Sequence, residues 1–462
     1  MKALFHHQIT GIEFLKEKVR AGLWDDMGLG KTAQAILAMK ELDAAPVLVV
    51  CPASLCTVWS KAIEEWYLEA TVTTVRGAKM HRIMQVKFDL LEEPTTFIII
   101  SYELLHTHLA DLCKLKVGGL IFDEAHRLKN RKTKTHKAAS LLSRRFLQKP
   151  LFTLSGTPIL NRTEELYSML HVIDPVTHSS FWRWAEDHLT TARTREADKW
   201  KVLIVGGPRQ PEAFKSYVSQ FGIRRIKEDC IDLPAKIFET VDVHLDGAQL
   251  KAYKTMRDQM YMRLSVGNME VGAPNALSAM LRLKQIAVST ALVDSYMPGI
   301  PGAKLEVLEE LMESSGDLPV VVFSQFADAV TKFHAHFERK YPCSTVKGDD
   351  SYRQRDKSVE LFQDGKLKAL FISTLAGGVG LTLTAGKIAV FTDLLWTPAL
   401  NNQAIDRLHR IGQEDSVMVY SLKAVNTIED YILNILGDKQ ALFDASIPVE
   451  RMARSQWKEL LR

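Results

Sequence analysis

Short apolar runs that alternate with amphipathic stretches are the feature of this sequence that most narrows its fold. Eight runs have the length and composition of buried strands, at 47–51, 97–101, 119–123, 151–155, 320–324, 369–373, 388–392 and 417–422. Helical periodicity lies between them, as at 31–42, 57–66, 161–173, 353–362 and 402–410. Alternation of strands and helices at this spacing predicts parallel sheets of the α/β class.

The strands fall into two groups, one before about residue 160 and one after about residue 300. The stretch between them is mostly helical in period, and 462 residues are enough for two or three domains. A Pro- and Gly-rich break at 297–302 reads as a linker. We therefore expect a first α/β lobe at 1–165, helical insertions and the linker at 166–300, and a second lobe with a helical end at 301–462.

Composition narrows the class of protein. No apolar run reaches the length of a membrane span and the start is not a signal peptide, so we expect neither a membrane protein nor a secreted one. The 5 cysteines lack C-x-x-C spacing and the 14 histidines lack H-E-x-x-H spacing, so we expect buried free thiols and no zinc. A net charge of +4 does not by itself indicate a nucleic-acid partner.

Residues 25–32, Asp-Asp-Met-Gly-Leu-Gly-Lys-Thr, have the composition of a phosphate-binding loop. The glycines let backbone N–H groups turn toward an anion, and the lysine adds charge for the β- and γ-phosphates. The threonine begins the next helix and can hold Mg²⁺ through its hydroxyl. Asp25 breaks the strict G-x-x-x-x-G-K-[ST] pattern, because it replaces the first glycine. The residues expected to bind nucleotide here are Asp26, Met27, Gly28, Leu29, Gly30, Lys31 and Thr32.

An acidic pair, Asp123 and Glu124, ends the apolar run at 119–123 and begins the sequence Asp-Glu-Ala-His. A carboxylate at the C-terminal end of a strand faces the ligand crevice of an open α/β sheet. We expect Asp123 to bind Mg²⁺ and Glu124 to orient or deprotonate an attacking water. A pair of acidic residues at the surface is the alternative interpretation of any isolated Asp-Glu. The presence of the phosphate loop in the same sequence makes this alternative the weaker interpretation.

Two arginines lie in the segment 403–413, Gln-Ala-Ile-Asp-Arg-Leu-His-Arg-Ile-Gly-Gln. On the helix expected at 402–410, Arg407 and Arg410 share a face with Gln403. In that arrangement the arginines would neutralise charge on a departing γ-phosphate, and Gln403 would report the nucleotide state. The alternative is an ordinary charged helix.

Candidates for nucleic-acid contact come from charge and from strand ends. The stretch 127–137 is densely basic; a solvated helix face explains the charge equally well, but its place after the acidic pair favours phosphate contact. Hydroxyl residues at strand ends are either turn and cap residues or phosphate contacts. Tryptophans at 59, 66, 182 and 184 could stack on bases, although packing is the favoured interpretation. The candidates are Ser54, Ser101, Lys129, Arg131, Lys132, Ser373, Thr374 and Trp396.

Taken in order, these motifs resemble those of the Swi/Snf-type superfamily-two DNA translocases, almost from end to end. The resemblance also rests on Gln8 with its neighbours, on 52–55, 100–103 and 154–161, on 224–234, and on 322–326 and 373–381. Asp26 stands where the family usually has Glu, and Thr397 stands where Asn is frequent. Neither departure removes a required charge or phosphate contact.

The resemblance implies two RecA-like lobes, with Gln8 reading adenine. It implies an enzyme that uses ATP and Mg²⁺ to move along double-stranded DNA, forked or branched DNA included, and to remodel or displace what is bound there. It further implies a monomeric core without reader domains, located in the cytoplasm or in a eukaryotic nucleus, with a targeting partner left open. A strand-separating or annealing helicase, and a motor subunit for a nuclease or modification enzyme, remain alternatives.

Overall fold

The computed structural model describes residues 3–75, 96–159, 162–196, 199–266, 273–293, 302–374, 381–433 and 436. Within them the chain divides into two compact units, the first ending at Asp232 and the second beginning at Leu233. Among the described helices, none is both long and apolar enough to cross a membrane. Residues 297–301 of the linker predicted at 297–302, and the motif residues 160–161 and 375–380, lie outside the described residues.

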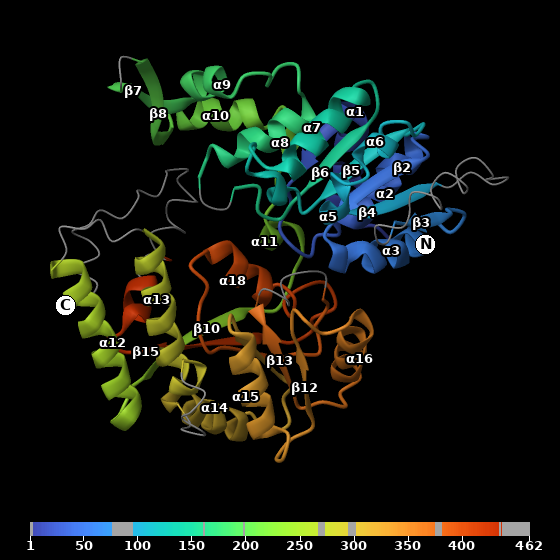
Figure 1. Ribbon diagram of the computed structural model, residues 1–462. Helices are drawn as coiled ribbons and strands as arrows, with labels where there is room; N and C mark the ends of the chain where they lie inside the picture. The colour runs from blue at the N-terminus through green and yellow to red at the C-terminus, as the bar shows by residue number, and fades with distance from the viewer. Residues whose placement is uncertain are drawn as a thin grey trace. The chain divides into compact units, whose positions relative to one another are not determined.

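The first unit is built on a parallel sheet, which has seven strands in the described part of the chain (Figure 1). The order is β3-β4-β2-β5-β6-β1-β9, and every pairing between these strands is parallel. The strands are β1 (Arg20–Leu23), β2 (Val47–Cys51), β3 (Val72–Thr74), β4 (Phe97–Ser101), β5 (Gly119–Asp123), β6 (Leu151–Leu154) and β9 (Gly222–Ile223). Because all run the same way, their C-terminal ends share one edge of the sheet.

Helices of the first unit bury the faces of this sheet. Alternate residues of the central strands, such as Leu48, Ile98 and Leu120, join one apolar cluster with residues of α7 and α8. The Arg20 guanidinium donates to the carbonyl oxygens of Ile173 (2.8 Å), the last residue of α8, and of Phe146 (3.3 Å), the C-cap of α7, which anchors the ends of both helices to β1. The helices are α1 (His6–Lys18), α2 (Lys31–Glu41), α3 (Cys56–Trp66), α5 (Tyr102–Leu105), α6 (Leu109–Leu112), α7 (Lys134–Arg145) and α8 (Glu165–Ile173), with 3₁₀ turns η1 (Ala53–Leu55) and η3 (Ala125–Leu128).

The stretch predicted to be helical after α8 is not helical throughout. It contains α9 (Phe181–His188), α10 (Pro211–Val218) and α11 (Lys227–Cys230), but also a two-stranded antiparallel sheet of β7 (Leu189–Glu196) and β8 (Lys199–Pro208). Figure 1 shows this pair next to α9 and α10. Thr191 pairs with Ile204, and residues 202–205, Val-Leu-Ile-Val, are rich in the β-branched residues that favour strands.

The second unit has its own parallel sheet, of order β10-β15-β14-β11-β13-β12 among the described residues. One face packs on α14 and α15, and the other packs on α16 and α18, through Phe362 and Ala404 among others. The strands are β10 (Lys236–Val243), β11 (Val320–Ser324), β12 (Cys343–Val346), β13 (Ala369–Ser373), β14 (Ile388–Phe391) and β15 (Val417–Ala424). The helices are α12 (Gly247–Val266), α13 (Ala273–Val288), α14 (Ala303–Ser314), α15 (Ala327–Phe337), α16 (Tyr352–Gln363) and α18 (Pro398–Ile405), with the 3₁₀ turn η4 (Thr290–Leu292).

The predicted α/β class with two parallel sheets is confirmed, and each of the eight predicted runs forms a strand. The helix predicted at 402–410 is wrong at its end, because α18 stops at Ile405. There the N–H of Arg407 bonds to the Ala404 carbonyl in a tighter turn (3.2 Å), and the Arg407 carbonyl accepts from the N–H of Leu383 (2.9 Å). The expectation of buried thiols holds for Cys51 and Cys56, whereas Cys113, Cys230 and Cys343 are partly exposed; all five are free.

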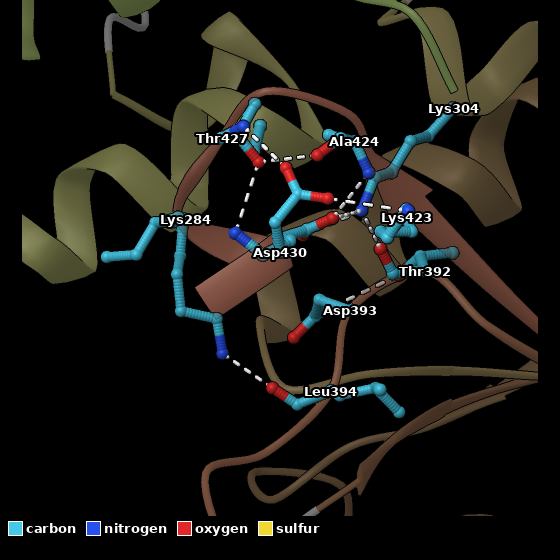
Figure 2. Close-up of polar contacts among 12 residues, drawn as sticks. Lys284, Lys304, Thr392, Asp393, Leu394, Lys423, Ala424, Thr427 and Asp430 are labelled. Carbon is cyan, nitrogen blue, oxygen red and sulfur yellow. Dashed lines mark hydrogen bonds and ion pairs between the residues drawn. The ribbon is translucent and has the colours of Figure 1, made fainter. Parts of the chain in front are cut away.

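A buried ion pair lies under the loop that leads from β14 to α18. The Lys304 ammonium, fully buried, contacts both carboxylate oxygens of Glu429 (2.6 and 2.7 Å) and donates to the Thr392 carbonyl (2.6 Å). Nearby, Lys284 donates to the Leu394 carbonyl (2.6 Å), as Figure 2 shows. The two ammonium groups therefore take the place of water as hydrogen-bond donors to backbone carbonyls of the loop after β14.

Lys304→Met should lower the free energy of unfolding by about 3–5 kcal/mol, because Glu429 would remain buried without its cation. Urea denaturation followed by tryptophan fluorescence measures this. The matched control is Lys423→Met, since Lys423 pairs at the surface with Asp242 (2.8 Å) and should cost less than about 1 kcal/mol. Equal decreases in the free energy of unfolding of the two single variants would contradict a larger contribution from the buried pair. The double variant Lys304→Met/Glu429→Leu should regain most of the stability that Lys304→Met loses.

Candidate functional site

The loop between β1 and α2 has the backbone of an anion cradle. Gly28 (φ 88°) and Gly30 (φ 74°) both lie in the left-handed region, which favours glycine. At Gly30 an added Cβ would stand 2.3 Å from Nε2 of Gln8 and would displace the end of that side chain. Met27 and Leu29 complete this loop, and Gly30 is the N-cap of α2. The positive end of the helix dipole therefore opens toward the loop.

Lys31 is held at the centre of the loop. Its Nζ donates to the carbonyl oxygens of Asp25 (2.6 Å) and Asp26 (3.0 Å). Desolvation lowers the pKa of Lys31, while the nearby carboxylates, Glu124 foremost, act in the opposite direction. An ideal Cβ on Gly156 would lie 3.6 Å from the same Nζ, which places the segment after β6 beside the loop.

Gln8, predicted to read adenine, lies against the phosphate loop. Its Nε2 is 3.4 Å from the Leu29 carbonyl oxygen, and its Oε1 accepts from the N–H of Phe5 (3.0 Å). Nε2 of His7 lies 3.1 Å from the same carbonyl oxygen, and Gln34 donates to it at 3.0 Å. Several side chains from α1 and α2 thus fix the backbone of the loop at Leu29.

Asp25 anchors the loop from behind. Its carboxylate is fully buried and forms a two-point ion pair with Arg225, at 2.9 Å from Nε to Oδ1 and 2.5 Å from Nη2 to Oδ2. The same guanidinium donates to the His7 carbonyl, to Thr10 Oγ1 (2.9 Å) and to Gln34 Oε1 (2.9 Å). One arginine therefore joins α1, the phosphate loop and α2.

Asp26 faces the same segment. Its carboxylate accepts from the backbone N–H of Lys227 (3.2 Å) and from Nη2 of Arg224 (3.5 Å). In this conformation the Asp26 backbone carbonyl contacts Lys31, while the Asp26 side chain holds the residues that begin α11.

The acidic pair lies at the C-terminal end of β5, as predicted from its position after the apolar run. Asp123 Oδ2 accepts from Trp59 Nε1 (2.8 Å), and the Asp123 carbonyl accepts from the Tyr102 hydroxyl (2.8 Å). Burial, then the adjacent negative charge of Glu124, raises the pKa of Asp123 to about 6. Two neighbouring carboxylates in a desolvated site are the arrangement that a divalent cation would relieve.

Glu124 has a strained backbone, with φ 49° and ψ 48° in the left-handed region. A non-glycine residue there is held by its surroundings, and such strain concentrates at functional sites. The Glu124 carboxylate lies 3.2 Å from Nδ1 of His126, and that nitrogen is 3.4 Å from Ser155 Oγ. His126 thus connects the acidic pair to the segment after β6.

The two halves of the predicted nucleotide site therefore meet within the first unit. The phosphate loop follows β1 and the acidic pair ends β5; both strands pair with β6 in parallel, so both segments lie at one edge of the sheet. The donor set fits a nucleotide with Mg²⁺. The loop and Lys31 suit phosphates, while Thr32 in the first turn of α2 and Asp123 offer oxygen ligands.

The nucleic-acid candidates of the first unit lie on several different elements. Ser54 lies in η1, and Ser101 is buried at the end of β4. Lys129 Nζ lies 3.9 Å from Glu165, and the Arg131 guanidinium lies 3.9 Å from the centre of the Phe181 ring. Lys132 is exposed in the turn before α7.

In the second unit, Gln403 is buried on α18 and Arg407 is buried beyond its end. Arg410 donates to Thr382 Oγ1 (3.0 Å), and desolvation lowers its pKa. The shared helix face predicted for these residues is wrong, because the chain turns after Ile405. Ser373 and Thr374 are buried at the end of β13, and the Trp396 ring packs under Lys284 Nζ at 5.6 Å.

Several site residues are not predicted by the sequence. From the sequence, Arg225 is only one residue of the motif segment at 224–234, and Trp59 is assigned to packing or base stacking. Tyr102 and His126 receive no individual role. Trp59 is buried, which excludes base stacking, yet it orients a catalytic candidate. For Trp59 and Tyr102 the sequence does carry a signal, because the N–H of a buried Trp and the O–H of a buried Tyr need hydrogen-bond partners.

A parallel sheet with a glycine-turned phosphate loop and an acidic pair at one edge defines an α/β nucleotide-binding protein. Residues 7–292 match the model of the SNF2-related domain, and residues 303–412 match that of the helicase conserved C-terminal domain. The chain belongs to the SNF2-related family.

The chain is similar to two curated relatives and to one solved structure. The ISWI chromatin-remodeling complex ATPase ISW1 of Saccharomyces cerevisiae is 29% identical over 94% of this chain and 40% of its own length. The putative ATP-dependent helicase/translocase YwqA of Bacillus subtilis is 30% identical over 95% and 48%. A solved Sulfolobus solfataricus SWI2/SNF2 ATPase core in complex with dsDNA is 25% identical, covers 96% of this chain and 92% of its own, and has a TM-score of 0.43. The chain spans less than half the length of these curated relatives.

Arg225→Lys should weaken binding of a fluorescent ATP analogue by about tenfold, because lysine cannot reproduce a two-point contact to Asp25. Titration at equilibrium measures this affinity. Arg224→Lys is the matched control, since Arg224 is partly exposed and its contact with Asp26 is long (3.5 Å). Unchanged affinity in Arg225→Lys, with a normal unfolding curve, would refute a positioning role.

Proposed function

We propose that this chain is a DNA-dependent ATPase that hydrolyses ATP to translocate along double-stranded DNA. The observation that carries the proposal is that the phosphate loop after β1 and the acidic pair at the end of β5 lie at one edge of the same parallel sheet, in a chain of the SNF2-related family. Desolvation lowers the pKa of Lys31, and the charges of Glu124 and Asp123 oppose that decrease.

Each group of residues in the site has its own proposed role in hydrolysis. The loop N–H groups and Lys31 would bind and orient the β- and γ-phosphates. Glu124, turned by its strained backbone and held near His126, would orient the attacking water and accept its proton. Thr32 and Asp123 would hold Mg²⁺, which supplies charge neutralisation when bound. Trp59 and Tyr102 keep Asp123 in place.

Roles for the second unit rest on the sequence resemblance. Arg407 and Arg410 would neutralise charge that develops on the γ-phosphate, and Gln403 would respond to the nucleotide. The basic surface around Lys129, Arg131 and Lys132, with hydroxyl groups such as Ser54 and Ser373, would contact DNA phosphates without sequence choice. We propose a monomeric motor that acts where chromosomal DNA is accessible, in the cytoplasm or in a nucleus, with a protein partner for targeting.

Steady-state ATP hydrolysis tests the proposal directly. The rate is measured without nucleic acid and with single-stranded, duplex and forked DNA and RNA, at equal nucleotide concentration. We expect duplex DNA to stimulate the rate most, because translocation on a duplex needs no strand separation. Stimulation by single strands or RNA alone would favour a strand-separating helicase. A rate that no nucleic acid changes would contradict a DNA-dependent motor.

Glu124→Gln should lower the DNA-stimulated rate by about 10²–10⁴-fold, because the amide cannot accept the proton of the attacking water. Binding of a fluorescent ATP analogue should be retained, since the phosphate loop is unchanged. Glu186→Gln serves as control; Glu186 lies on α9 and pairs with Arg193 (2.9 Å). Hydrolysis at the wild-type rate in Glu124→Gln would remove Glu124 from the mechanism.

A further inference from the structure

A cavity of about 430 Å³ lies between α7, α8 and the start of α9 in the first unit. No residue of the phosphate loop or of the acidic pair lines it. We propose that this cavity is a second phosphate-binding site, which takes a phosphate group of a nucleic-acid backbone or of a free phosphorylated molecule. The proposal does not depend on the ATPase activity, because its residues are separate from those of hydrolysis; it shares Arg131 with the basic surface proposed to contact DNA.

Three cationic side chains converge on the cavity. Lys137 and Arg144 lie two turns apart on one side of α7, and Arg131 reaches it from the preceding loop. No lining residue is acidic, and within the described ranges no carboxylate forms an ion pair with Arg131, Lys137 or Arg144. Three uncompensated charges at one concave site favour an anion, and guanidinium forks match phosphate oxygens.

The walls of the cavity are held in place before any ligand binds. The Phe181 ring supports the Arg131 guanidinium at 3.9 Å. His171 Nδ1 lies 2.6 Å from the His178 carbonyl oxygen, which can only accept, so Nδ1 carries the hydrogen. Nε2 therefore accepts from the Ser140 hydroxyl at 2.8 Å. Ser143 of α7 donates to the Val172 carbonyl (2.6 Å), which fixes α7 against α8.

His136 forms part of the wall of the same cavity. It is only 4% exposed, and its Nδ1 has no hydrogen-bond partner among the described residues. Burial, then the charge of His171, lowers the pKa of His136 to about 4, so the ring is neutral at physiological pH. A neutral His136 adds no charge to the cavity, so the positive charge of the cavity comes from Arg131, Lys137 and Arg144.

The dimensions and lining favour phosphate over a smaller anion. The volume falls within the range of small-ligand sites, and Tyr167 and Phe181 provide aromatic walls beside the charges. A phosphate attached to an organic group would meet both surfaces at once.

The test compares two double variants of α7 in the full chain. Lys137→Gln/Arg144→Gln removes two lining charges, and both side chains are exposed enough to spare the fold. Lys134→Gln/Arg145→Gln removes the same charges from the same helix outside the cavity. Both are made with Lys31→Ala, so that the phosphate loop does not contribute. Isothermal titration calorimetry with inorganic pyrophosphate, and duplex DNA binding at several salt concentrations, are the two measurements.

We expect the cavity variant to weaken pyrophosphate binding by about tenfold or more relative to the control variant. If a DNA phosphate occupies the cavity, the slope of log K against log salt should also fall by about 0.9 for each DNA phosphate that the variant leaves without a cation. A decrease in pyrophosphate binding alone identifies a free phosphorylated ligand; a change in DNA slope identifies the nucleic-acid backbone. Identical behaviour of the two double variants in both measurements overturns the proposal.

Discussion

The pair between Asp25 and Arg225 is the interaction on which the nucleotide site depends. These residues are 200 positions apart, and the backbone between them leaves and returns to the same sheet. Strand β9 adds to β1 through Gly22 and Gly222, and the ladder continues until the N–H of Asp26 bonds to the Arg225 carbonyl (3.0 Å). A buried carboxylate needs such a partner. The residues after α10 therefore determine the conformation of the phosphate loop.

The sequence is sufficient where the signal is contiguous. Eight apolar runs predict eight strands, and the glycines and Lys31 predict the loop that follows β1, because a cradle of this kind is coded in adjacent residues. Short strands such as β1 and β9 carry too few residues for periodicity. The contact of Arg225 with Asp25 and the bond from Trp59 to Asp123 join distant segments, which one sequence does not reveal. The helix predicted at 402–410 ends early because the Leu383 N–H, a tertiary partner, bonds to the Arg407 carbonyl.

In the second unit, buried polar groups fix the loop that leads into α18. Lys304 and Lys284 bind the carbonyls of Thr392 and Leu394, while the Asn401 amide bonds both the N–H and the carbonyl of Leu395 (2.9 Å each). Each bond satisfies a backbone group that burial would otherwise leave unpaired. The start of the helix that carries Gln403 is therefore set by polar contacts, and single substitutions in them should move its residues together.

The charged residues at the sheet edge of the first unit indicate a place for a ligand, because a packed core would not retain them. Asp123 and Glu124 are adjacent carboxylates in a desolvated place, one with a raised pKa and the other with a strained backbone. Lys31 is the cation that faces them, and it is itself desolvated. A packed core would be more stable with apolar residues at these positions. Retaining the charges costs stability in the free chain, and binding a polyanion with its divalent cation offsets that cost, so nucleotide binding should couple directly to the stability of this edge of the sheet.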